Sequence, residues 1–206
     1  MVHRIYVEKQ PRFAQEAAAA LADIRGVLGI SCVKGVRILN RYDVEGVSSA
    51  LFSSCRYTVF AEPQMDAAYD APPEEADAVF AVEYLPGQFD QRAEAAARCI
   101  ALLSQAEAPL VRTARVYLLR GAITEAEIDA IKRYLINPVE SREASLALPH
   151  TLALTAQAPP RIPVLVGFCA LEKAALPEWV ARYGLAMDAD DLGCCQTYFQ
   201  SERRDP

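Results

Sequence analysis

The chain has 206 residues, of which 52% are hydrophobic and 23% charged. That balance is typical of a globular protein, and a chain of this length buries roughly 70% of its unfolded surface. Acidic residues outnumber basic ones 27 to 21, and the net charge of −6 argues against a nucleic-acid or anionic-membrane surface. The apolar runs are too short to span a membrane, and the first residues indicate a strand rather than a signal peptide. We therefore expect a cytoplasmic protein.

Cysteine and histidine are placed unfavourably for a metal site. The six cysteines, which we expect to be reduced, include no C-x-x-C pair, and the only histidines are His3 and His150. A cluster of aspartates at residues 188–191 is explained by helix capping and needs no metal. We expect no metal ligands and no catalytic residues.

The sequence contains an internal repeat. Residues 4–9 and 78–84 are predicted strands, and both carry Val-Glu followed by x-x-Pro. The helical patterns that come next, residues 13–24 and 89–100, match at six of twelve positions without a gap, and three of the matches are alanines. Similarity at a fixed spacing indicates a duplicated structural unit.

Each half continues with the same order of elements. Residues 36–41 and 116–120 are rich in β-branched residues and are predicted as strands. After the second of these, Thr124 and Glu127 form a capping-box pattern that opens a helix. Residues 48–55 are predicted as its weaker counterpart in the first half.

We therefore predict an α+β domain at residues 1–145, made of two β-α-β-α units. The first helix of each unit has one narrow apolar stripe, which fits a helix that covers one face of a sheet. Together the units are expected to form a pseudo-two-fold domain, similar to two fused ferredoxin-like halves. Residues 57–60 are predicted as an added strand.

The last part, residues 146–206, has a different pattern. Residues 148–163 contain four prolines and little periodicity, which indicates an extended linker. A short helix is expected at residues 177–183, with Gly184 after its end, and Asp188 is expected to cap a final helix. The apolar stripe of that last helix is thin, so this small helical region is expected to need other structure to lie against.

Four longer segments support a family resemblance. They are residues 37–46 (RILNRYDVEG), 84–92 (YLPGQFDQR), 136–143 (INPVESRE) and 183–188 (YGLAMD). In these segments, and over essentially all of its length, the chain resembles the N-terminal region of formylglycinamidine ribonucleotide synthases of the large single-chain form.

This resemblance implies which domains of the parent enzyme the two parts of the chain correspond to. Residues 1–145 resemble a fused pair of the PurS-type small subunit, and residues 146–206 resemble the linker domain. Enzymes of this family use ATP, magnesium and glutamine-derived ammonia to convert an amide into an amidine in purine biosynthesis. Their synthetase and glutaminase regions lie beyond the part that this chain resembles. The resemblance thus implies a segment without catalytic residues or a cofactor of its own, whose partners are those two regions.

Two polar segments are candidate docking sites for such partners. One precedes and opens the helix of the second half, and the other follows the capping-box helix. An arginine in the second can pair with a carboxylate through two parallel hydrogen bonds. The candidate docking residues are Gln88, Asp90, Gln91, Arg92, Glu140 and Arg142. The alternatives are a tight turn with Phe89 buried and an ordinary solvated loop.

Other functions stay open at this point. An ACT-like regulatory domain would bind a small molecule between its two halves. A thiol enzyme would need a thiolate on a strained turn, and Cys194-Cys195 lacks the glycine that normally follows such a nucleophile. The apolar stripe of the last helix also predicts that the isolated segment can self-associate.

Overall fold

The computed structural model describes residues 1–73, 76–154 and 161–206. The chain divides into two compact units, Met1–Leu154 (unit 1) and Thr155–Pro206 (unit 2), and each is described by itself. Part of the predicted linker at residues 148–163 lies outside the described residues.

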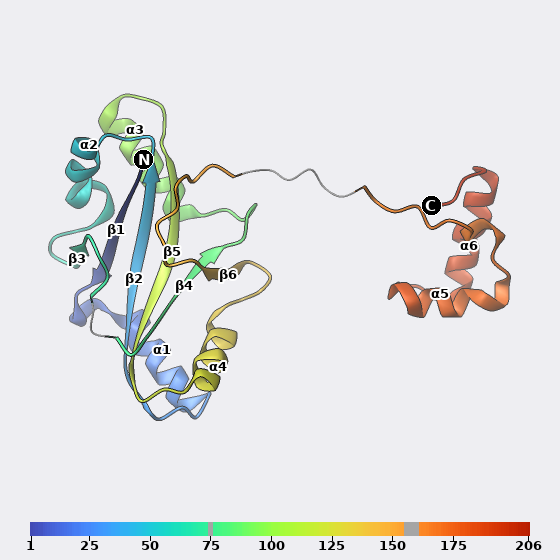
Figure 1. Ribbon diagram of the computed structural model, residues 1–206, viewed down its shortest axis with the longest axis horizontal. Coiled ribbons are helices and arrows are strands. Elements are labelled where there is room, and N and C mark those ends of the chain that lie inside the picture. The colour runs from blue at the N-terminus through green and yellow to red at the C-terminus, as the bar shows by residue number, and fades with distance from the viewer. Residues whose placement is uncertain (74–75, 155–160) are drawn as a thin grey trace. The chain divides into compact units, whose positions relative to one another are not determined.

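Unit 1 contains a six-stranded sheet in the order β3-β1-β2-β5-β4-β6 (Figure 1). All neighbouring strands are antiparallel, and the long strands β2 and β5 pair at the centre. The strands are β1 (Val2–Lys9), β2 (Val33–Glu45), β3 (Asp66–Tyr69), β4 (Ala78–Tyr84), β5 (Leu110–Gly121) and β6 (Ser141–Ala144). The predicted α+β class is confirmed, but each half has a short third strand that was not predicted, so its order is β-α-β-α-β.

The two halves of the sheet have the same register. Ile5 pairs with Tyr42, and the residues 75 positions later, Phe80 and Tyr117, pair with each other. The same displacement of 75 residues relates the two edge pairs, Tyr6–Tyr69 and Ala81–Ala144. Every strand pairing of the first half therefore has a counterpart in the second at a constant spacing.

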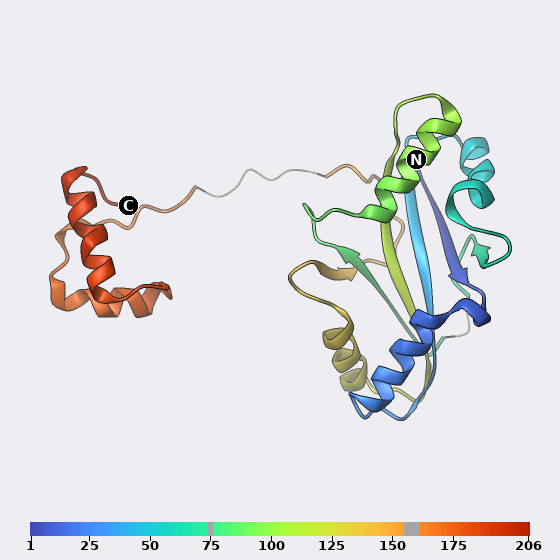
Figure 2. The ribbon, with the colours of Figure 1, turned by 180° about the vertical axis from the view of Figure 1, so that it is seen from behind.

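Four helices accompany the sheet, and the longer two, α1 and α3, lie in front of it in Figure 2. The helices are α1 (Gln15–Gly26), α2 (Ser49–Ser54), α3 (Gln91–Ser104) and α4 (Glu125–Leu135). The predicted capping box of α4 is present, because Thr124 and Glu127 satisfy each other's backbone N–H groups. Ser48 caps α2 through its side chain, so the predicted weaker helix also forms.

Each long helix packs against a strand pair of the other half. Ile100 of α3 is 1% exposed and lies in one buried cluster with Ile5 and Tyr42 of the β1–β2 pair. Ile24 of α1 is fully buried and lies in a second cluster with Tyr117 of the β4–β5 pair. Neither half therefore completes its core without the other.

Residues 145–154, which follow β6 and are called the crossing segment, cross the opposite face of the sheet. This face is turned to the viewer in Figure 1. Arg4 donates to the carbonyl oxygens of Leu146 and Ala147, and Arg112 donates to that of Leu152 at 2.6 Å. The sequence assigned residues 146–154 to the second domain, but these contacts place them with unit 1.

Two local predictions were wrong. Residues 57–60 do not form a strand, because they belong to a π-helical turn, Arg56–Phe60, that brings Phe60 to 5.0 Å from the Tyr42 ring. Phe89 is 72% exposed rather than buried, because α3 starts only at Gln91 and Phe89 therefore lies outside its apolar stripe.

Unit 2 has a small core of its own, centred on Phe168, Leu176 and Leu192. Its helices are α5 (Leu176–Tyr183) and α6 (Ala189–Ser201), and two 3₁₀ turns precede them. Both predicted helices are confirmed, with Gly184 left-handed after α5 (φ 59°) and Asp188 capping α6. The stripe of α6 packs against α5 and the first 3₁₀ turn, so it is covered from within the unit.

Among the described residues, no helix combines the length and apolar character that crossing a membrane requires.

Candidate docking and binding site

The two candidate docking segments lie side by side at the end of β4. The backbone N–H of Leu85 donates to the carbonyl oxygen of Glu140 at 2.9 Å. The side chain of Gln88 reaches the carbonyl oxygen of Val139 at 3.5 Å. The fold thus brings together residues that are about fifty positions apart in the sequence.

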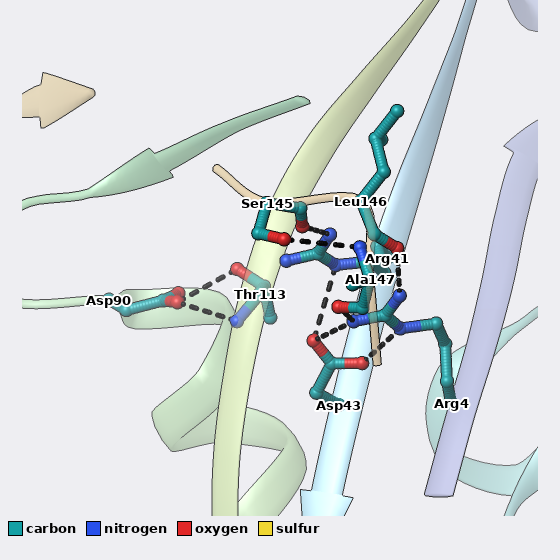
Figure 3. A network of polar contacts seen from close by, with 8 residues as sticks. All are labelled: Arg4, Arg41, Asp43, Asp90, Thr113, Ser145, Leu146 and Ala147. Carbon is teal, nitrogen blue, oxygen red and sulfur yellow. Dashed lines mark hydrogen bonds and ion pairs between the residues drawn. The ribbon is translucent and has the colours of Figure 1, made fainter. Parts of the chain in front are cut away.

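Asp90 has a structural role that uses its whole carboxylate. Oδ1 accepts from the backbone N–H of Ala93 at 2.9 Å and so caps α3. Oδ2 accepts from the backbone N–H and the hydroxyl of Thr113 in β5, at 3.1 and 2.8 Å, as Figure 3 shows. Asp90 therefore ties the start of α3 to the sheet, and it has little capacity left for a partner.

Gln91 and Arg92 open α3 and are exposed. Arg92 donates to the hydroxyl of Tyr42, at 3.4 Å. Burial acts to lower the pKa of Arg92, but the hydrogen bond and charge of Tyr42 outweigh it, and the pKa is raised. The guanidinium is thus cationic and remains accessible.

Arg142 forms an ion pair with a carboxylate of unit 1 itself. Its Nε and Nη2 lie 2.9 and 2.8 Å from the same oxygen of Glu83, on the neighbouring strand β4. Both contacts use one oxygen, so the pairing differs from the two parallel bonds that the sequence suggested. The side chain of Glu140 is exposed beside it.

Two cavities flank the docking segments. The larger, about 530 Å³, is bordered by Asp90, Gln91, Arg92 and Glu140, and the smaller, about 430 Å³, by Gln88, Asp90 and Arg142. All six candidate residues therefore border one cavity or the other.

The same end of the unit exposes large apolar side chains. Tyr84 is 45% exposed, Phe89 72% and Val139 76%. Such residues next to glutamine and arginine side chains are typical of a protein interface, whose core favours aromatic and arginine residues.

A buried polar network was not predicted from the sequence. Arg4 donates from Nε and Nη2 to both carboxylate oxygens of Asp43, and Nε of Arg41 lies 3.2 Å from Oδ2 of the same carboxylate (Figure 3). Arg41 also donates to the carbonyl oxygen of Ser145 at 2.7 Å. The network thus fixes the start of the crossing segment to β1 and β2.

One carboxylate compensates two guanidinium groups in this network. Burial lowers the pKa of Arg41, and the charge of Asp43 only partly opposes this. Burial also acts on Arg4, but the hydrogen bond and charge of Asp43 prevail there and raise the pKa. Carbonyl oxygens of the crossing segment accept further hydrogen bonds from both arginines, whereas Nε of Arg41 makes no hydrogen bond to the described residues.

Three of the six cysteines do not resemble activated nucleophiles. Burial raises the pKa of Cys32, Cys55 and Cys169, whereas a catalytic thiolate needs a lowered pKa. Within the described ranges, no three or more histidine, cysteine or acidic side chains are grouped as a metal ion would require.

Comparison with protein-family models and with curated proteins finds no match to this chain.

Proposed function

We propose that this chain is the non-catalytic N-terminal assembly segment of a formylglycinamidine ribonucleotide synthase. In this role unit 1 is a duplicated domain equivalent to a PurS-type dimer, and unit 2 is the linker domain. The segment bridges the synthetase and glutaminase parts of the enzyme and supports the transfer of ammonia between them. ATP and magnesium act elsewhere in the parent enzyme.

The single observation that carries the proposal is the constant spacing of the two halves. Each strand pairing recurs 75 residues later, which is also the spacing of the Val-Glu motifs at Val7-Glu8 and Val82-Glu83. An accidental likeness of two halves would not preserve the register of every strand.

The reciprocal packing supports the comparison with a dimer. Ile24 of the first half and Ile100 of the second each complete the core over the strand pair of the opposite half. Two separate copies of one subunit would bury the same surfaces against each other, because a two-fold interface is self-complementary.

The docking segments supply the contact surface that an assembly role requires. Their exposed apolar residues, Tyr84, Phe89 and Val139, stand beside polar side chains that a partner could engage. The resemblance covers the first of these segments at residues 84–92 and the second at residues 136–143, so the surface coincides with two of its motifs.

Reconstitution tests the proposal. The partner is a single-chain synthase of this family from which the matching N-terminal segment has been deleted. Sedimentation should detect a complex with the 206-residue chain, and glutamine-dependent amidine formation should return on mixing. The chain alone should form no amidine. Failure of the wild-type chain to bind, or turnover by the chain alone, would refute the assembly role.

A pair of matched variants locates the contact. Phe89→Asp should weaken the complex by about tenfold or more, since aromatic residues at the centre of interfaces carry much of the binding energy. Leu102→Asp makes a similar apolar-to-acidic change at a residue that is 79% exposed but lies near the end of α3, away from the docking segment at the start of that helix, and binding should be retained. Equal weakening by both changes would place the contact elsewhere.

A further inference from the structure

The larger cavity lies between the two halves and has features of a small-molecule site. Its volume of about 530 Å³ falls within the range of ligand pockets. Asn40 and Tyr42 come from β2 of the first half, and Arg92 and Arg115 come from α3 and β5 of the second. No single half could form it.

One residue of the cavity lining, Asn40, has an unsatisfied acceptor. Oδ1 of Asn40 is buried and accepts no hydrogen bond from the described residues. Asn40 pairs with Arg115 across the strands, and Arg115 pairs in turn with Val82, so the three residues form one row of the sheet. A buried acceptor without a donor destabilises the folded chain unless a ligand supplies the hydrogen bond.

Charges of both signs border the same space. Among the described residues, Arg92 donates one hydrogen bond, to the Tyr42 hydroxyl at 3.4 Å, which leaves most of its N–H groups for a carboxylate. Glu140 is exposed at the rim and can attract a cation. The remaining lining includes apolar side chains: Val59, Val82, Ala96 and Leu135.

We propose that this cavity binds a free α-amino acid. Its carboxylate pairs with Arg92, its ammonium group donates to Oδ1 of Asn40, and its side chain packs on the apolar lining. A phosphate fits less well, because the carboxylate of Asp90 already occupies the N-terminus of α3. The proposal goes beyond the assembly role and does not depend on it.

Titration of the full chain with each of the twenty amino acids tests the proposal, with inorganic phosphate as the comparison. At least one amino acid should bind saturably by calorimetry and raise the melting temperature. Arg92→Ala should weaken that binding by about tenfold or more, since a hydrogen bond to a charged group is lost. Arg98→Ala, on the same helix outside the cavity, should leave binding unchanged.

Asn40→Leu separates loss of binding from loss of folding. It removes an unpartnered buried oxygen, so the unliganded chain should melt at the same temperature or higher while amino-acid binding falls by about tenfold. The proposal is overturned if no amino acid binds, if only phosphate binds, or if Arg92→Ala and Asn40→Leu bind as tightly as the wild-type chain. None of these results bears on the reconstituted complex.

Discussion

Replacement of Asp43 by asparagine should destabilise unit 1 by about 3–5 kcal/mol, the usual cost of removing one partner from a buried ion pair. Its carboxylate is 3% exposed, and the side chains of Arg4 and Arg41 that it compensates are 9% and 6% exposed. A neutral amide leaves two buried guanidinium groups without a counter-charge and turns an N–H donor toward one of them. Since a domain is stable by only about 5–15 kcal/mol, this is a large share.

Hydrogen exchange of the β2 and β5 backbone measures the effect in unit 1. A loss of about 3 kcal/mol should speed exchange of the most protected amides by about a hundredfold or more. Trp179, the only tryptophan, lies in unit 2, so its fluorescence during urea unfolding reports on that unit separately. The tryptophan transition should stay unchanged.

Asp70→Asn is the matched control. The Asp70 carboxylate pairs with Arg56 at 2.9 Å, but it is 81% exposed, and exposed ion pairs contribute about 0–1 kcal/mol. The loss of stability caused by Asp43→Asn should therefore be much larger than the loss caused by Asp70→Asn. Similar small effects of the two changes would refute the view that the buried network stabilises unit 1.

Four further outcomes follow from single contacts. Asp90→Ala should lower the stability of unit 1 by about 2–4 kcal/mol in urea unfolding, because it removes the cap of α3 and leaves a backbone N–H group of β5 without its acceptor. Phe168→Ala should cost unit 2 about 3–5 kcal/mol and abolish its tryptophan transition, since this 2%-exposed ring centres a small core. Gly121→Ala should lower the melting temperature of unit 1, because φ is +141° and the added Cβ would clash with the backbone carbonyl oxygen of Cys32. Backbone hydrogen bonds, foremost from Cys169, hold the pKa of Asp205 below its ordinary value. The contribution of Asp205 to the stability of unit 2 is therefore complete above about pH 4 and is lost as the pH falls through the folded-state pKa. Asp205→Asn should make the stability of unit 2, followed by tryptophan fluorescence, less sensitive to acid.

Local chemistry explains which elements the sequence could predict. The capping boxes at Thr124 and Asp188 are readable because their partners lie three residues away. The edge strands β3 and β6 have no such signal: their sequences, DAAY and SREA, lack β-branched residues, and they form because β1 and β4 offer open edges for pairing. Tertiary pairing rather than intrinsic preference decides these four-residue strands.

The polar network shows a different limit. Arg41 and Asp43 are two residues apart, so a strand places them on one face, and that much could have been predicted. Their burial depends on Arg4 from β1 and on residues 145–147 from beyond β6, which no spacing in the sequence indicates. Charged residues on a strand normally indicate a solvated face, and only the crossing segment makes this one buried.

The position of the proposed docking surface follows from the register and the order of the strands. Tyr84 pairs with Ser141, so the loop that leaves β4 and the loop that enters β6 must meet. The corresponding loops of the first half also meet. The backbone hydrogen bond from Leu85 to Glu140 has a counterpart from Gln10 to Met65, with both residues displaced by 75.

The two equivalent ends differ in what they expose. In the second half Phe89 and Val139 are 72% and 76% exposed, whereas in the first half Phe13 is partly covered by the guanidinium of Arg12, 4.6 Å from its ring, and the position 75 residues before Val139 is the polar Gln64. The two equivalent ends thus differ in exposed apolar surface at these positions. A symmetric dimer would present both, so the asymmetry favours one docked partner for each chain, and Phe13→Asp should leave the reconstituted complex intact where Phe89→Asp weakens it.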